Sequence, residues 1–350
     1  MAVYIRSTEA ISPQNTFHTD SFLSEVIVPD KDYFSCIHPD YKEYINPRLL
    51  RRMSNMIRMG LAASTLCLDH AGLKQVDAIL IGTGLGCVED TLKFLDQIID
   101  NQEELLNPTA FIQSTHNTVS GQIALMLGCR NHNLTFSQKT ISFESALLEG
   151  IMWLKDKENQ NILVGGIDEL VDKSFSLMVE SGCARIVRTD EMMDSKLPGA
   201  LRGEGSTFFA MSNMESPDTL AQIDDMEIIN RCPSTDVLIT RLEKFLNRNG
   251  LSAGDIDVVV SGKNGDVRLK SIYDDLNKLF AKSIVVGYKH LVGDYDTASA
   301  FGCYLASKMI HLNVVPECVR LNDVTKNTIS RCLVVNYSRN RDFSCTLLSG

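Results

Sequence analysis

The sequence has no block of basic residues and no long apolar run. Its 34 lysines and arginines are scattered and are outnumbered by 44 aspartates and glutamates, so the formal net charge is -10. A polyanion such as DNA is therefore expected to be repelled. Residues 1–10 lack the charged and then apolar pattern of a signal peptide. Apolar stretches such as residues 76–88 are glycine-broken and too short to span a bilayer. We expect a cytoplasmic protein with neither nucleic acid nor a membrane as partner.

The ten cysteines include no CxxC pair and have no histidine at metal-ligand spacing. We therefore expect free thiols, most of them packed as small hydrophobic side chains, and no bound metal. The glycine-rich turn at residues 82–86 follows an apolar strand pattern, but Cys87 stands where a dinucleotide-binding GxGxxG motif needs glycine. We interpret this turn as a tight strand-to-helix connection and expect no cofactor.

Two parts of the chain follow the same plan. Residues 77–82 and 257–262 each begin with an aspartate, continue as an apolar strand and close on glycine. Each follows a helical pattern that stops at a Gly-Leu pair, ending in Leu73 in the first copy and Leu251 in the second. Other apolar strands alternate with helices along the chain, which indicates an α/β fold. The polar turn residues 212–218 separate the copies, so we predict two similar α/β halves.

Five local patterns, taken in chain order, resemble the landmarks of the β-ketoacyl-acyl-carrier-protein synthases. They lie at residues 81–86, 117–124, 163–169, 203–210 and 288–293, the last followed by the small-residue stretch 298–305. In particular, the chain resembles the degenerate ketosynthase and chain-length-factor-like proteins of aryl-polyene and flexirubin pigment clusters. The resemblance spans nearly the whole chain.

The fold that this resemblance implies is the thiolase fold, in which two similar halves build α-β-α-β-α layers. The N-terminal half is then expected at residues 1–211 and the C-terminal half at residues 219–350, with residues 212–218 as the connecting stretch. Leu80 and Val259 should be buried at equivalent places in the two halves.

The resemblance also implies a catalytic cysteine at a strand-to-helix elbow, where the helix N-terminus lowers the thiol pKa and backbone N–H groups receive an oxyanion. Matching Leu147 to the family pattern places Phe143 at the cysteine position, and a shift by one residue gives Ser142 or Glu144. No register supplies a thiol. We expect Phe143 to fill the helix start and the acyl pocket, and no cysteine to lie within reach of the site.

Two histidines that assist decarboxylation in the family are replaced as well. By the resemblance, Lys263 stands at the first histidine position and Asp294 at the second, while Lys289 keeps the family lysine. His290 is close in sequence but offset by four positions. The family's C-terminal glycine-rich loop is expected at residues 336–343, which contain no glycine. None of the family's catalytic groups is therefore expected to be intact.

From these losses we predict a chain-length-factor-like subunit that pairs with a cysteine-bearing ketosynthase, shapes its acyl tunnel and does not condense on its own. The resemblance implies a dimer across the strand at residues 133–137 and an acyl carrier protein as a second partner. Four arginines near one helix could receive an acidic carrier or form a solvated face, and these are Arg48, Arg51, Arg52 and Arg58.

Two other functions stay open at this point. One is an enzyme of the fatty acid or polyketide type with altered chemistry, such as decarboxylation, acyl transfer or 3-oxoacyl-carrier-protein synthesis by a non-standard site. Its polar groups would be Glu144, Lys263, Lys289 or His116, although His116 is also interpreted as a structural hydrogen-bonding residue on a loop. The other is a homodimer that binds acyl carrier protein and regulates.

Overall fold

The computed structural model describes residues 1–19, 21–185, 196–339 and 341–350. Within these ranges, ten strands form one mixed sheet in the order β3-β2-β4-β5-β1-β6-β10-β9-β7-β8. The strands are β1 (Val3–Ile11), β2 (Ala78–Gly82), β3 (His132–Phe136), β4 (Asn161–Asp168), β5 (Gly205–Ser212), β6 (Ala221–Ile229), β7 (Val258–Ser261), β8 (Ile284–Gly287), β9 (Arg331–Tyr337) and β10 (Phe343–Ser349).

The α-helices fall between these strands, as the α/β pattern predicts. They are α1 (Pro47–Leu50), α2 (Asn55–His70), α3 (Val88–Asp100), α4 (Pro108–Gln113), α5 (Thr118–Leu127), α6 (Ser142–Asp156), α7 (Asp172–Glu180), α8 (Thr235–Arg248), α9 (Lys270–Leu279), α10 (Lys289–Val292) and α11 (Ser299–Leu312). None of the helices in the described ranges is long and apolar enough to cross a membrane.

The strand order repeats between the two halves of the sheet. The first five strands run β3-β2-β4-β5-β1, and the next five, read from the other edge, run β8-β7-β9-β10-β6. In both halves the three outermost strands are parallel and the inner pairs are antiparallel. The halves join where Val3–Ile5 of β1 pairs with residues 221–223 of β6. The predicted pair of similar α/β halves is confirmed. β5 ends at Ser212 and β6 begins at Ala221, and the division at residues 212–218 stays a prediction.

The aspartate that opens each copy of the repeated sequence unit makes the same hydrogen bond in both halves. In the first half the Asp77 carboxylate accepts a hydrogen bond from the backbone N–H of Asn161, at 2.9 Å, where β4 begins. In the second half the Asp257 carboxylate accepts from the N–H of Arg331, at 3.0 Å, where β9 begins. Each aspartate therefore sets the register of the parallel strand beside it. Leu80 and Val259, on the two matching strands, are both buried as predicted.

Both repeated helices end as their Gly-Leu pairs predict. Gly72 after α2 and Gly250 after α8 have φ angles of +66° and +71°. The next N–H in each case, from Leu73 or Leu251, donates to a carbonyl in the last turn of its helix, at 2.9 and 3.0 Å. This arrangement satisfies carbonyls that the helix end would leave unpaired, and glycine adopts the left-handed conformation at no steric cost.

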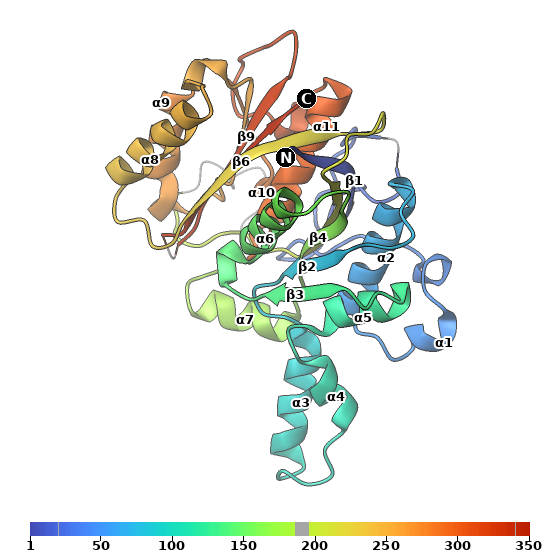
Figure 1. Cartoon of the computed structure of the whole chain (residues 1–350). Helices are drawn as coiled ribbons and strands as arrows, with labels where there is room; N and C mark the ends of the chain where they lie inside the picture. The colour runs from blue at the N-terminus through green and yellow to red at the C-terminus, as the bar shows by residue number, and fades with distance from the viewer. Residues whose placement is uncertain (20, 186–195, 340) are drawn as a thin grey trace.

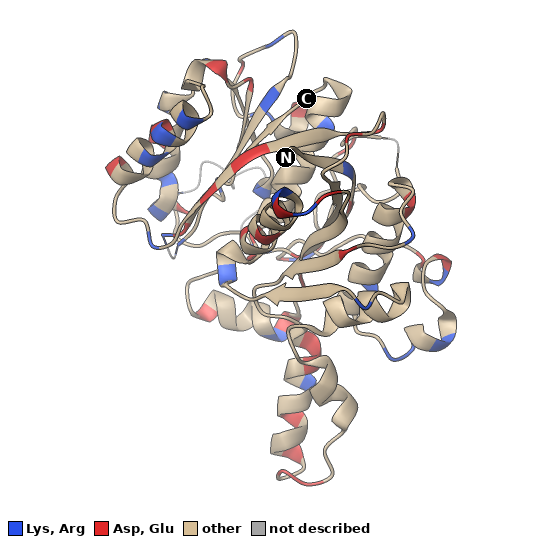
Figure 2. Cartoon of the chain, in the orientation of Figure 1, with Lys and Arg blue, Asp and Glu red and all other residues tan. Residues whose placement is uncertain are grey.

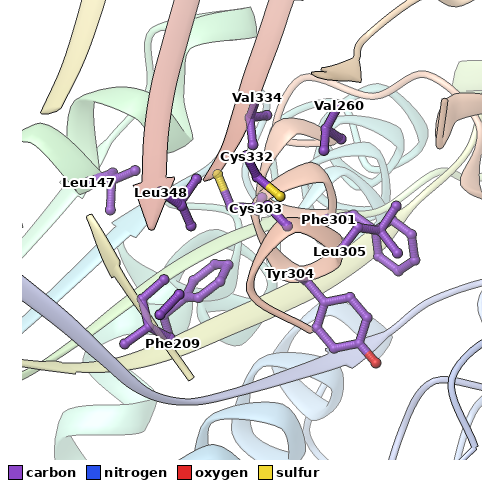
Figure 3. Close-up of a cluster of buried hydrophobic side chains, with 14 of the residues drawn as sticks. Leu147, Phe209, Val260, Phe301, Cys303, Tyr304, Leu305, Cys332, Val334 and Leu348 are labelled. Carbon is purple, nitrogen blue, oxygen red and sulfur yellow. The ribbon is translucent and has the colours of Figure 1, made fainter. Parts of the chain in front are cut away.

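The elements stack in five layers (Figure 1). α6 and α11 lie in the middle, and their apolar faces pack on strands of both half-sheets. α2 and α5 cover the outer face of the first half-sheet, and α8 and α9 cover the outer face of the second. Figure 3 shows the central layer, with Leu147 of α6, Phe301 and Leu305 of α11, and Phe209 and Leu348 from the strands above and below. The α-β-α-β-α order is the expected one.

The hairpin of α3 and α4 projects from this body (Figure 1). The rings of Phe94 and Phe111 hold the two helices together at a centroid distance of 5.3 Å. Figure 2 shows acidic residues along α3, and lysines and arginines scattered over the outer helices of this view instead of gathered on one face. This charge distribution agrees with the scatter seen in the sequence.

Candidate functional site

A polar pocket of about 260 Å³ lies at the carboxyl ends of β7 and β9. Its walls come from segments far apart in the chain: Thr140 before α6, Cys183 after α7, Asn264 after β7, and Lys289 with residues 294–296 and 336–339. The carboxyl ends of parallel strands commonly carry the functional groups of α/β proteins, because the connections that leave them converge there. We treat this pocket as the candidate site.

Lys289 and Asp294 form a buried ion pair in this pocket. The Lys289 ammonium donates to Asp294 Oδ1 at 2.7 Å and to Asn336 Oδ1 at 3.0 Å. Asp294 Oδ2 accepts from Arg202 and from Asn264, each at 3.1 Å. Burial alone would raise the pKa of Asp294, but the charges of Lys289 and Arg202 outweigh it and hold the pKa of this carboxyl below its usual range. Asp294 is therefore ionised.

An ionised carboxylate accepts hydrogen bonds and cannot donate one. Asp294 therefore cannot give a proton or a hydrogen bond to a forming enolate oxygen, which is the task of the histidine that the resemblance puts at this position. Because both of its oxygens are engaged by cationic or amide donors, its role here is to hold Lys289, Arg202 and Asn264 in place.

Phe143 lies in the first turn of α6, at the predicted elbow, and its side chain is 1% exposed. Its ring packs against Phe209 of β5 at a centroid distance of 5.7 Å. The backbone of α6 comes so close to Gly82 that a Cβ there would overlap the Ser142 carbonyl. Phe143 is thus part of the central core, and its side chain does not line the polar pocket.

The other predicted residues are also placed away from the pocket wall. The backbone N–H of Lys263 donates to Ser261 Oγ at 3.3 Å. The side chain of Lys263 does not line the pocket, whereas the neighbouring Asn264 does. Glu144 is buried beside Ser344, whose hydroxyl donates to it at 2.9 Å, and burial raises the pKa of Glu144. His116 is exposed and packs on Gly86. Of the residues singled out in the sequence, the pocket brings together Lys289 and Asp294.

One prediction about the pocket is wrong. No cysteine was expected within reach of it, yet Cys183 lies in its wall together with Lys289 and Asp294. The segment after α7 turns back, and Ala184 forms a bridge with Ala200 that carries Cys183 into the wall. A hydrogen bond to Ser181 lowers the pKa of the Cys183 thiol, and the nearby Arg339 lowers it further. Sequence spacing carries no signal for this approach, because α7 and β9 meet only in the tertiary fold.

The remaining thiols match the expectation from the sequence. All ten cysteines are free, and seven of them are buried. Only Cys129, Cys183 and Cys318 are partly exposed. Desolvation raises the pKa of buried thiols such as Cys303, so these behave as small hydrophobic groups. Cys183, by contrast, lines the pocket and has a lowered pKa. Among residues 1–19, 21–185, 196–339 and 341–350, no group of three or more histidine, cysteine or carboxylate side chains is arranged to hold a metal ion.

A buried carboxylate, Asp168, ties the glycine turn to the second half of the chain. Its Oδ1 accepts from the N–H of Gly84 at 2.7 Å, and its Oδ2 accepts from the N–H and hydroxyl of Thr297, both at 2.9 Å. Burial, and then the charge of Asp296, raise the pKa of Asp168. The backbone of the turn at residues 82–86 is therefore bonded to a buried protein carboxylate. Glycine in this turn allows that close approach.

Comparison with known proteins shows which proteins share this architecture. Residues 38–193 match the family model of the β-ketoacyl synthase N-terminal domain. No curated protein sequence matches the chain significantly. Among solved structures, the ishigamide ketosynthase/chain length factor superposes with a TM-score of 0.81 at 16% identity, covering 99% of this chain and 98% of that chain.

Two further structures agree. A β-ketoacyl synthase from Burkholderia phymatum STM815 superposes with a TM-score of 0.79 at 14% identity, covering 99% of both chains. The type II polyketide ketosynthase AntDE, solved in complex with its acyl carrier protein AntF, superposes with a TM-score of 0.74 at 15% identity, covering 100% of this chain and 99% of that chain. The predicted resemblance to the ketosynthases and the predicted fold class are confirmed.

Proposed function

Since the chain has the ketosynthase fold but presents a core phenylalanine at the elbow, we propose that it is a chain-length-factor-like subunit that pairs with a cysteine-bearing ketosynthase. The observation that carries this proposal is the burial of the Phe143 ring, which lies in the first turn of α6 and packs against β5. A phenyl ring cannot be acylated, and condensation by this family's route needs a thioester at that place. The proposed subunit binds and shapes an acyl tunnel without condensing.

The state of the second predicted histidine position supports the same proposal. Decarboxylation of an extender needs a donor to the enolate oxygen, whereas Asp294 is an ionised acceptor held by Lys289 and Arg202. Losing the thiol and the donor together leaves the framework without the two chemical functions of a ketosynthase. Another subunit has to supply them if the assembly makes products.

The free edge of the sheet supplies the proposed pairing surface. β3 is the edge strand of the first half, and an exposed edge is a template for pairing with another chain. Apolar side chains are exposed on it and on the helices beside it, namely Leu134 on β3, Leu125 on α5, and Leu148 and Met152 on α6. This surface fits the dimer across residues 133–137 that the resemblance implies. An acyl carrier protein is the proposed second partner.

Pairing can be tested by co-expressing the chain with candidate cysteine-bearing ketosynthases and measuring co-purification and condensation of malonyl carrier protein. We expect no condensation by the chain alone and condensation by the pair. Leu134→Asp and Met152→Asp should weaken pairing, because they place a charge in an apolar contact.

Val237→Asp is the matched control, since Val237 is as exposed as Leu134, at 39% against 38%, but lies on α8, on the other half of the molecule from β3 (Figure 1). If the two edge variants pair as well as this control, the proposed surface is wrong. If no ketosynthase binds at micromolar concentration while the chain forms a homodimer, the regulator becomes the better account.

A further inference from the structure

We propose that the cleft between residues 30–33 and α7 binds a linear organic polyamine, whose ammonium groups pair with carboxylates on the rim and whose methylene groups pack on Tyr33 and Phe175. We call this cavity the α7 cleft. It shares no lining residue with the polar pocket at the ends of β7 and β9. The proposal goes beyond the pairing role and does not rest on it, because binding needs only this chain.

The α7 cleft is a cavity of about 620 Å³ with an aromatic floor. Its volume falls within the roughly 300 to 1,000 Å³ of small-molecule pockets. Tyr33 is 5% exposed and Phe175 is 7% exposed, and their ring centroids lie 5.0 Å apart. Both rings pack with Leu170 and Ala184 in a small core of their own, and Val179 packs against it. The floor is therefore held in place, and it offers apolar surface to a ligand.

The rim of the α7 cleft carries four carboxylates and only one cation. The carboxylates are Asp30, Asp32, Asp172 and Glu180, and the cation is Lys31. None of these carboxylates forms an ion pair with a residue that the structure describes. Like charges that gather around one cavity repel each other, and a cationic ligand relieves this repulsion. Charge complementarity therefore indicates a ligand with several positive charges.

The ammonium of Lys31 shows how this cleft receives a cation. It lies 5.1 Å from the centroid of the Tyr33 ring and donates to the Tyr33 hydroxyl at 3.3 Å. An ammonium over an aromatic face is attracted by the negative potential of the ring. The same hydroxyl donates to Asp172 Oδ1 at 2.5 Å. An ammonium, an aromatic ring and a carboxylate are thus already in contact here, and a ligand ammonium finds the same kinds of group in the rest of the cleft.

The spacing of the carboxylates indicates a long ligand. Asp172 begins α7 and Glu180 ends it, and eight residues of helical rise span about 12 Å. One ammonium group or one metal ion cannot contact both ends. A linear polyamine can, because its ammonium groups are separated by three or four methylenes, and these methylenes can pack on Phe175 and Val179 between the two charged ends.

The binding test uses the full chain alone, with spermidine as the probe and isothermal titration calorimetry at low ionic strength. We expect one saturable site per chain, and an affinity that falls as salt is added because exposed charges are screened. Asp32→Asn combined with Glu180→Gln should weaken binding roughly three- to tenfold, since each exposed charge pair contributes modestly. Absence of saturable binding overturns the proposal.

A matched pair of substitutions separates the α7 cleft from the general attraction of an acidic protein for polyamines. Asp236→Asn combined with Glu243→Gln also removes one aspartate and one glutamate charge. Both residues are exposed on α8, lie outside the cleft and form no ion pair with a described residue. This control should bind spermidine as the parent chain does. Equal weakening in the two double variants would show that only the net charge matters, and the proposal would be wrong.

Lys31→Met should change the affinity in the opposite direction. Removing this ammonium takes away a like charge that competes for Tyr33 and the carboxylates, so spermidine should bind roughly two- to fivefold more tightly. Weaker binding in this variant would contradict the proposed arrangement. Butylamine, with a single ammonium, should bind more weakly than spermidine, and equal affinities would exclude a site that spans α7. Binding of a lysine-rich peptide without any binding of spermidine would assign the cleft to a protein partner and overturn the polyamine proposal.

Discussion

At the residue scale, the side chain at the start of α6 decides what this framework can do. A thiol there would face developing charge, whereas Phe143 faces Phe209 and the strands of the first half-sheet. At this position a ring that packs in the core therefore stands where a reactive thiol would be needed. The polar groups that remain, Lys289 and Asp294, are bonded to each other, so they are better suited to hold the pocket walls than to move protons.

Truncating this ring has a structural cost that can be measured. Phe143→Ala should lower the free energy of unfolding by about 3 to 5 kcal/mol, because it removes a fully buried ring and leaves a cavity. Denaturant unfolding checks this, with Phe111→Ala as control, since Phe111 is 56% exposed on α4 and should lose far less. Equal losses in both variants would contradict the core position of Phe143.

In the reconstituted pair, the milder Phe143→Leu should lengthen or broaden the acyl products without abolishing turnover.

At the element scale, the approach of α6 to β2 sets the elbow. Gly82 ends β2 and lies directly against the backbone of Ser142 and Phe143. The helix can start there only because no side chain intervenes. The glycine of the 82–86 turn therefore has a packing reason.

Gly82→Ala should therefore destabilise the chain strongly, because the new methyl group meets backbone that cannot rotate away. Gly121 is the matched control. It lies within α5, a Cβ there would meet nothing within 4 Å, and alanine in a helix is favoured over glycine by roughly 0.5 to 1 kcal/mol. Thermal unfolding should thus give shifts of opposite sign for Gly82→Ala and Gly121→Ala. A tolerated Gly82→Ala would mean that the elbow is looser than the structure shows.

At the scale of the whole molecule, buried carboxyls make stability depend on pH. Burial raises the pKa of Glu169 from 4.5 to about 8, against the opposing hydrogen bond from the Glu89 N–H. A carboxyl with a raised folded-state pKa binds its proton more tightly when folded, so its stabilising effect is complete below the unfolded pKa and is lost as pH rises.

We therefore expect the free energy of unfolding to fall as pH rises from about 4.5 to about 8, the interval over which the Glu169 proton is lost from the two states. Glu169→Gln should flatten this fall, since an amide does not titrate. The measurement is urea unfolding at several pH values. A slope that is identical in the variant and the parent chain would assign the dependence to other groups, such as Asp168, whose pKa burial also raises.

The sequence by itself determined the features that depend on local pattern. The Gly-Leu stops after α2 and α8, the repeated apolar strands and the aspartates before them all act within one supersecondary unit, so their spacing predicted the two similar halves. The order of the layers was implied by the family resemblance. The predicted resemblance was carried by short motifs of the same local kind. The lack of a thiol at the start of α6 could also be read directly from the residues.

Only the tertiary structure decided which side chains share the pocket. Cys183, Asn264, Asp296 and Asn336 come from segments after α7, β7, α10 and β9, and contacts over such separations leave no periodic signal in the sequence. Lys263 was predicted in place of Asn264 because motif spacing does not specify which way a loop residue points. Phe143 lies in the first turn of α6, and its burial in the core depends on Gly82 and Phe209, which approach it only when the half-sheet has formed.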